Sequence, residues 1–429
     1  MSNEYIGRSI YLGIAKETTR GTAPASPDFW LRLLAQNHKQ QVDYLHSQGS
    51  QGTIVENAHA EVDKQWAEGG FDAEIEPDSI GLVLLSLMGG VVSAPEGTGH
   101  LHTYDLDDNS ANHQSLAVYT AEPARDETFP LACMDSLTFN FERGKILDFS
   151  ANYISQAGSA GSHTPAFTDL KVFRPKDFHF YIADDIAGLA TADEVFLKSF
   201  NLEFNKNLEH DDVLGLESPQ NFLNKVFSTS ATMELFHKDE TYRNLFKAGT
   251  PKAIRVKIEN PNLEIDEATK AQGTATVVDY AELSGKKLTV GGVELTEGVD
   301  WTAATSNDAT ATSLASAVDA LPNVTASATT NEVNIVAATG GTAGNSITLV
   351  SDGGSDLTVS GATLTGGLDD GTYANMVFDF ARVYFSEHDE NNGRDDIKAQ
   401  TITLSFAVNT DEATIPFGQV RLLNETASY

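Results

Sequence analysis

The stretch WAEGGFDAEIEPDSIGLVLLSLMGG, residues 66–90, contains the two kinds of element that the chain uses repeatedly. Residues 65–76 predict a β-strand, because acidic and apolar side chains alternate after a glycine pair. Residues 77–90 predict a short apolar helix, since Pro77 stands at its start and glycines stand at its end. The stretch is therefore a strand that leads directly into a helix.

The same order of elements recurs in the second half of the sequence, which indicates an internal duplication. Residues 225–236 predict a strand, and residues 237–249 predict a helix that ends in glycine. In each half a further strand and a long hairpin follow, at 116–122 and 137–156 and again at 253–260 and 376–409. We therefore predict a mainly β chain with a duplicated β-sandwich or barrel domain and short helices.

One segment differs from the rest in composition. Residues 273–367 contain no Phe, His or Arg, although the whole chain has 22 Phe and 11 His. The pattern predicts two strands, an Ala-rich helix at 309–321 and three further strands, a ββαβββ order with its own small core. Strand patterns resume after the segment, so we predict that it is inserted into a continuing β-domain. The predicted domains are 1–160, 161–272 together with 368–429, and the inserted 273–367.

The charge of the chain argues against binding to nucleic acid. The sequence has 28 Lys and Arg and 61 Asp and Glu residues, a net charge of −33, whereas nucleic-acid binders place basic side chains against phosphates. An acidic surface also favours solubility, and the two interpretations are compatible. The start of the chain has no basic region followed by an apolar run, so we expect no secretory signal. The longest apolar stretch, 80–92, is too short to cross a bilayer, so we expect no membrane partner.

No motif in the sequence indicates catalysis. The sequence contains no phosphate-binding loop and no hydrolase signature. In so acidic a chain carboxylates lie near one another by chance, so no pair of them can be assigned to acid–base catalysis. Cys133 is the single cysteine, which excludes an intrachain disulfide and a multi-cysteine metal site. His100 and His102 lie two residues apart and could ligate a metal, although solvated histidines are the commoner reason for such a pair. We therefore predict no enzyme activity, no cofactor and no metal site.

Four segments and their order are the most specific signals. They are residues 66–90, YLGIAKETTRGTAPASPDFWL (11–31), FERGKILDFSANY (141–153) and the terminal VRLLNETASY (420–429). Together they resemble the major tail tube proteins of long, flexible-tailed (siphovirus-type) bacteriophages. The resemblance covers residues 1–270 and 368–429, and the inserted segment resembles small β-rich modules of phage structural proteins.

The resemblance implies a structural protein whose copies stack as rings into a hollow tail tube, the conduit for DNA ejection into the host. Its partners would be further copies of itself, the tape measure protein, and tail terminator and tip proteins, with double-stranded DNA passing non-specifically. The expected location is the virion, after synthesis in the bacterial cytoplasm, with the inserted domain on the outside of the tube. If one duplicated chain supplies two segments of the tube wall, six segments need three chains, which predicts homotrimer rings with pseudo-sixfold symmetry. The alternative is a β-sandwich module that binds cell surfaces or carbohydrate.

Two groups of site residues follow from this interpretation. Polar residues of the hairpins would face the lumen and repel DNA phosphates, namely Asn140, Glu142, Asp148, Asn152, Glu203 and Asn205. Two long polar stretches, 38–63 and 205–224, would form contacts between rings and become ordered only on stacking. The residues proposed for these inter-ring loops are Asp43, Tyr44, His46, Gln48, Glu56, His210, Asp211 and Asp212.

Overall fold

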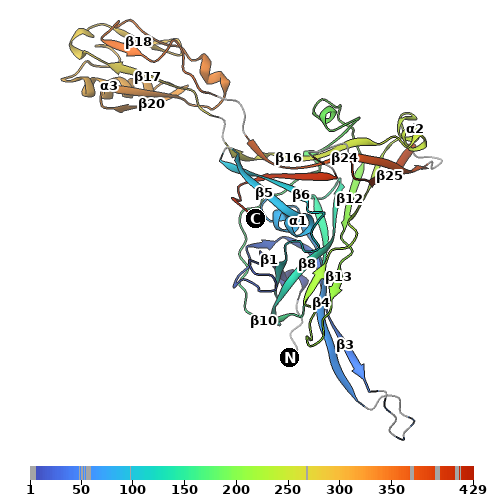
Figure 1. Ribbon diagram of the computed structural model, residues 1–429. Coiled ribbons are helices and arrows are strands. Elements are labelled where there is room, and N and C mark those ends of the chain that lie inside the picture. The colour runs from blue at the N-terminus through green and yellow to red at the C-terminus, as the bar shows by residue number, and fades with distance from the viewer. Residues whose placement is uncertain are drawn as a thin grey trace. The chain divides into compact units, whose positions relative to one another are not determined.

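The computed structural model describes residues 6–47, 49, 52, 54, 59–96, 98–266, 269–367, 372–391, 397–410, 415 and 417–429 (Figure 1). The chain forms two compact units. The first unit comprises Met1–Leu263 and Tyr373–Tyr429, and the second unit comprises Glu264–Thr372. The composition change at residues 273–367 falls inside the second unit.

One long antiparallel sheet, here called the main sheet, runs through the first unit. Among the described residues its strands pair in the order β3–β4–β9–β8–β12–β15–β25–β24. In β15 buried and exposed residues alternate along the strand, which is the pattern of a sheet with one face on a core. The strands are β3 Leu33–His46, β4 Ala60–Glu74, β9 Asp148–Gln156, β8 Asp126–Glu142, β12 Ser199–Asn205, β15 Ser228–Phe236, β25 Ala399–Phe406 and β24 Thr372–Asn391.

The main sheet consists of two equivalent groups of four strands, β3–β4–β9–β8 and β12–β15–β25–β24. Both groups contain the same irregularity, because β8 has a bulge between Met134 and Ser136, and β24 has one between Phe385 and Glu387. A bulge inserts one residue at a defined place in a strand, so it marks equivalent positions in the two groups. The mainly β prediction is confirmed, and the bulges support the duplication.

A backbone hydrogen bond gives the same alignment of the two halves. The Ile75 N–H donates to the Leu147 carbonyl at 2.9 Å, and the His237 N–H donates to the Lys398 carbonyl at 3.0 Å. Each bond lies just beyond the end of the pairing between equivalent strands, β4 with β9 and β15 with β25. Ile75 and His237 are therefore equivalent residues.

The glycine pair Gly69–Gly70 in the stretch 66–90 has a steric cause. A Cβ atom on Gly69 would lie 2.4 Å from the Tyr153 ring, and one on Gly70 would lie 2.6 Å from Asn152 Oδ1. The two side chains of β9 thus cross β4 on opposite faces of the main sheet, where only glycine leaves room.

Both halves fold back into a second layer over the apolar face of the main sheet. The N-terminal part of β8 pairs with β7 and β10, and β7 pairs with β1, which also pairs with β2. In the second half β24 pairs in the same way with β26 and β16. On one side β16 pairs with β11. On the other side β26 pairs with β6, which pairs with β5. These strands are β1 Tyr11–Lys16, β2 Phe29–Leu31, β5 Gly89–Glu96, β6 Gly99–Leu106, β7 Leu116–Ala121, β10 Ser159–Gly161, β11 Phe178–Ala183, β16 Lys252–Asp266 and β26 Gly418–Asn424.

The two predicted helices of the first unit are present and differ in burial. All nine residues of α1 (Ile80–Met88) are buried, as expected for a helix that is apolar on every side. The more polar α2 (Thr241–Ala248) rests on the core through Tyr242 and Leu245. Shorter elements are η1 Gly7–Ser9, η2 Pro175–Asp177, η3 Ala187–Ala190, β13 Glu209–Asp211 and β14 Asn221–Leu223. In the described parts of the chain, none of the helices has both the length and the apolar composition that a membrane span requires.

The second unit has its own core around Trp301, Leu314 and Ile335. Its two sheets have the orders β20–β21–β17–β23 and β19–β18–β22, and α3 packs on the first of them. The predicted ββαβββ order omitted two strands, β17 and β23. The elements are β17 Gln272–Val277, η4 Tyr280–Glu282, β18 Lys287–Val290, β19 Val293–Thr296, α3 Asn307–Asp319, β20 Val324–Thr329, β21 Glu332–Ala337, η5 Thr342–Ser346, β22 Leu349–Ser351 and β23 Leu357–Val359.

Candidate assembly surfaces

The junction between β8 and β12 joins the two groups of the main sheet within one chain. Seven residue pairs span it, from Ser199 opposite Glu142 to Asn205 opposite Ser136. Both groups are complete four-stranded units, so the junction shows how the last strand of one unit accepts the first strand of the next. At the two ends of the main sheet stand β3 and the C-terminal part of β24, each with a row of backbone N–H and C=O groups at its outer edge.

The equivalence of the two groups can be followed residue by residue across the sheet. Starting from the residue after each bulge, the pairing runs Ser136–Asn152–Gly70–Asn37 in the first group and Glu387–Thr403–Thr232–Asn201 in the second. Asn37 of β3 is therefore equivalent to Asn201 of β12. Counting onward from the bulge in the same way makes Asp389 equivalent to Thr138 and Asn391 equivalent to Asn140.

The six lumen candidates all lie on the polar face of the main sheet, opposite the core. Asn152 Nδ2 donates to Ser136 Oγ at 2.9 Å, and Asn201 Nδ2 donates to Asn140 Oδ1 at 2.8 Å. Side-chain hydrogen bonds therefore connect neighbouring strands on this face. From β4 to β24 the described basic residues of this face are Lys64, towards the tip of β4, and Arg382, before the bulge of β24. Its carboxylates are Glu68, Asp72, Glu74, Glu142, Asp148, Glu203, Glu234, Glu387 and Asp389.

The carboxylates of this face are not equally available. Asp148 is only 5% exposed, and Lys145 pairs with both Asp148 (2.8 Å) and Glu142 (2.9 Å). Lys145 therefore offsets much of the charge of these two candidates. Glu203 is exposed, and the residues opposite it are the uncharged Thr138 and Ser230. Glu203 is therefore the exposed carboxylate among the candidates for which no ion pair is described.

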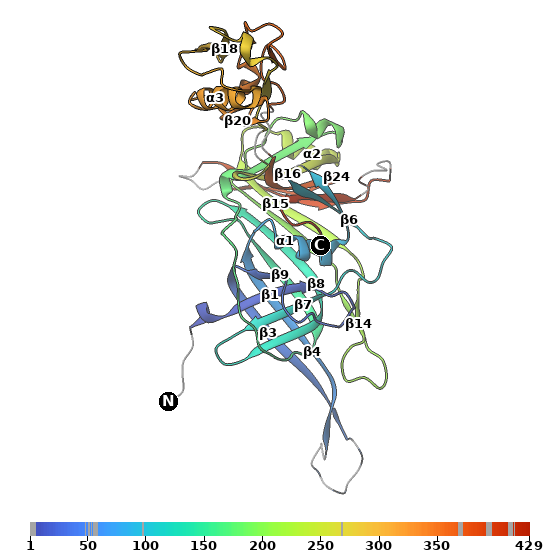
Figure 2. The same cartoon turned by 90° about the vertical axis from the view of Figure 1, so that its left-hand side faces the viewer.

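The polar stretch 38–63 is largely a two-stranded ribbon, not the loop that we expected. Asp43, Tyr44 and His46 belong to β3, which pairs with β4 as far as His46 opposite Ala60. In both views the ends of β3 and β4 extend away from the rest of the first unit (Figures 1 and 2). Backbone pairing makes a polar segment a strand even without a core face, which explains the difference. Gln48 and Glu56 lie outside the described residues.

The ribbon carries apolar side chains that the first unit does not cover. Tyr44 is 56% exposed and Leu45 is 59% exposed, and Val42 and Val62 are also exposed. Exposed apolar side chains grouped on one projecting element mark an interaction surface.

The stretch 205–224 is anchored to the first half within a single chain, so the expectation that it becomes ordered only on stacking was wrong. Lys64 Nζ lies 2.7 Å from Asp212 Oδ2, and the Gln65 N–H donates to the Glu217 carbonyl at 2.6 Å. The Arg20 side chain donates to Asn221 Oδ1 at 2.7 Å. His210 and Asp211 form part of the short strand β13. The stretch 205–224 therefore packs on the first half of its own chain, whereas we had expected a neighbouring ring as its partner.

A lysine is buried where the second half meets the first. Lys206 follows β12, is 1% exposed, and donates from Nζ to the Ser86 carbonyl of α1 at 2.9 Å. Burial lowers the pKa of Lys206 to about 8. Charging this side chain therefore opposes folding, although its bond to α1 helps to locate the second half on the first.

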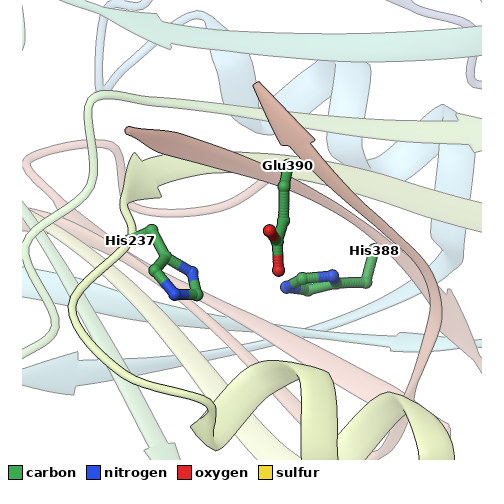
Figure 3. A group of neighbouring side chains, drawn as sticks. All are labelled: His237, His388 and Glu390. Atoms are coloured by element: carbon green, nitrogen blue, oxygen red, sulfur yellow. The ribbon is translucent and has the colours of Figure 1, made fainter. Parts of the chain in front are cut away.

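In the histidine pair that could have ligated a metal, the buried residue His102 has a structural role. His102 is fully buried, with Ser93 Oγ 2.7 Å from Nδ1 and both Asn424 Oδ1 and the Thr426 carbonyl within 3.0 Å of Nε2. Both ring nitrogens are therefore already engaged. A different group, which the sequence did not suggest, comes together from the residue that follows β15 and from β24: His237, His388 and Glu390 (Figure 3).

The family model described as phage tail tube protein matches residues 7–303. The match covers more than half of the chain and runs from the first strand into the second unit. No curated protein matches the chain.

Proposed function

Because the chain belongs to the phage tail tube protein family, we propose that its copies close into rings and that these rings stack into the tube through which phage DNA leaves the capsid. Membership of the family makes the chain a structural component of the virion tail. The proposal concerns how the copies join. It rests on one observation, the β8–β12 junction between two equivalent groups of strands.

Repeating this junction between copies pairs the outer edge of β24 in one copy with the outer edge of β3 in the next. The equivalences transfer the register as well. Asn140 opposite Asn201 becomes Asn391 opposite Asn37 of the neighbour, and Thr138 opposite Glu203 becomes Asp389 opposite Lys39 of the neighbour. A lysine and an aspartate then face each other directly, and opposite charges in that arrangement stabilise strand pairing.

The charges of the face support this register. Lys39 lies on the polar face of the terminal strand β3, and the described residues of this face after the bulge of β24 are Glu387, Asp389 and Asn391, none of which is basic. In the proposed ring each Lys39 meets a carboxylate of the neighbouring copy. Pairing every terminal strand also removes the free edges that would otherwise promote aggregation.

The number of copies per ring follows from the duplication. Each chain supplies two four-stranded groups, so a ring of six groups contains three chains and has pseudo-sixfold symmetry. A heterologous interface of this kind closes when the rotation between neighbouring groups divides a full turn.

The polar face would then line the tube. Its uncompensated carboxylates would repel DNA phosphates and prevent tight binding during passage, over a distance of about 8 Å at physiological salt. Glu203 is the residue best placed for this role, since it is exposed and lies among uncharged neighbours.

The ribbon of β3 and β4 is the proposed contact between stacked rings, through Tyr44 and Leu45. At the ends of the tube the same surfaces would meet other tail proteins, which are the tape measure, terminator and tip proteins. Burial of the exposed apolar side chains would supply the free energy of stacking.

Electron microscopy of the purified chain, combined with native mass spectrometry, tests the proposal. We expect tubes or rings with three chains per ring. Six chains per ring would overturn the stoichiometry. Monodisperse monomers that bind glycans would overturn the tube assignment in favour of the β-sandwich adhesion module.

A further inference from the structure

Three positions of the apolar core in the first half carry potential metal ligands in the second half. Ile75 is equivalent to His237 through the shared backbone hydrogen bond. Counting from the bulges makes Leu137 equivalent to His388 and Phe139 equivalent to Glu390. Ile75, Leu137 and Phe139 are fully buried at 0% exposure, so the second half carries two imidazoles and a carboxylate where the first half carries three core residues.

The three side chains converge on one point. One ligand atom from each of His237, His388 and Glu390 lies within 4.8 Å of the other two. The Glu390 carboxylate points between the two imidazole rings (Figure 3). The His237 side chain is only 13% exposed, and its Nδ1 is buried without a hydrogen-bond partner. A buried polar atom without a partner is costly, and a ligand at this point would satisfy it.

The neighbours of the group are compatible with a bound cation. Gln400 Oε1 lies 3.0 Å from His388 Nε2, and Lys398 Nζ lies 2.7 Å from Glu390 Oε2. The Lys398 side chain is 38% exposed and can turn to solvent, because a surface ion pair of this kind contributes only about 0–1 kcal/mol. Glu240 Oε1 lies 3.8 Å from His237 Nε2, the ring nitrogen opposite the unpartnered Nδ1, so this carboxylate can accept the Nε2 proton when Nδ1 binds a metal.

We propose that His237, His388 and Glu390 bind a divalent transition-metal ion, with Zn²⁺ as the expected ion. Two imidazoles and one carboxylate are a donor set for zinc and its neighbours, whereas Ca²⁺ and Mg²⁺ prefer sites made entirely of oxygen. The ion would link the end of β15 to the part of β24 that forms the outer edge of the main sheet. The argument for this site does not use the proposed tube assembly, although the site lies beside the strand edge that the assembly would pair.

Zn²⁺ titration of the chelator-treated full-length chain by isothermal calorimetry tests the site, with Co²⁺ absorption as a second readout. The variant H237I/H388L introduces the residues of the first half, and E390Q removes the carboxylate while keeping its shape. We expect one Zn²⁺ per chain and at least about tenfold weaker binding in both variants, since loss of an outer-shell partner alone costs that much. Zn²⁺ should also raise the melting temperature of the unchanged chain but not of E390Q.

The matched control is His59→Ala, which removes an exposed histidine of the β3–β4 ribbon and should leave the affinity unchanged. Wild-type affinity in both H237I/H388L and E390Q would overturn the proposal. The absence of one strong Zn²⁺ site per chain in the unchanged protein would overturn it equally. Circular dichroism of each variant separates a lost site from a lost fold.

Discussion

Asn201 lies directly opposite Asn140 across the β8–β12 junction, and its side-chain amide donates to Asn140 Oδ1 at 2.8 Å. The two residues belong to different halves of a duplicated domain. Their pairing is therefore an example, contained in one chain, of how two equivalent four-stranded groups join. The predictions below follow from that junction and from the contacts around it.

The proposed pair of Lys39 and Asp389 can be tested by exchanging the charges. K39D or D389K alone should reduce tube formation, because like charges then face each other at every junction between copies. A directly opposite pair contributes roughly 0.2–1 kcal/mol, and the effect repeats at each junction of each ring. The double variant K39D/D389K should recover assembly, measured as the fraction of protein that sediments as tubes.

K247D is the control for this experiment. It alters net charge by the same amount as K39D on the exposed surface of α2 and should assemble normally. If the double variant assembles no better than the single ones, the register of the junction is wrong.

Replacing the exposed apolar residues of the ribbon should separate ring closure from stacking. We expect Y44S/L45S to form rings that no longer stack, since both side chains are more than half exposed in the single chain. Electron microscopy distinguishes single rings from tubes. V293S/V299S removes exposed valines of the second unit and serves as the control. Long tubes of Y44S/L45S would show that the ribbon does not hold the rings together.

Lys206 should make stability depend on pH in the alkaline range. Its pKa falls from 10.5 to about 8 on folding, so between these values the unfolded chain binds more protons than the folded one. The free energy of unfolding therefore rises with pH across this window, by up to about 3 kcal/mol from this group. K206M should be more stable at pH 7 by about 2 kcal/mol, because it removes the charge but also loses the bond to Ser86, worth about 1 kcal/mol.

Urea unfolding of the unassembled chain between pH 7 and pH 10 measures this effect. K206M should show a flatter dependence on pH than the unchanged chain. The exposed Lys247→Met provides the comparison and should keep the original slope. An unaltered slope in K206M would mean that Lys206 is not the titrating group.

Glu203 offers a test of the polar face as the wall of the tube. E203K places a cation among uncharged neighbours and should slow DNA ejection by roughly threefold or more, because phosphates are attracted instead of repelled. Ejection can be followed by fluorescence of released DNA from particles that carry the variant. E282K, on the second unit, should leave the rate unaltered. Equal rates for both variants would remove Glu203 from the wall.

Several features of the fold could be predicted from the sequence because their cause is local. The apolar run between Pro77 and Gly89 predicts a buried helix, since its side chains are apolar on every side and glycine ends it. Alternation in residues 228–236 predicts a half-buried strand. The change in composition at residues 273–367 marks a segment with different packing. In each case the residues of one stretch of the chain are sufficient for the prediction.

The features that concern assembly were decided by the tertiary structure alone. The sequence by itself determined the two helices of the first unit and strands such as β15, because period and polarity are properties of neighbouring residues. It did not determine that β8 pairs with β12, that residues 205–224 are anchored at Lys64, or that His237 meets His388 and Glu390. Backbone hydrogen bonds between strands are the same for every residue type, so partners distant in the chain are selected by the packing of the whole unit.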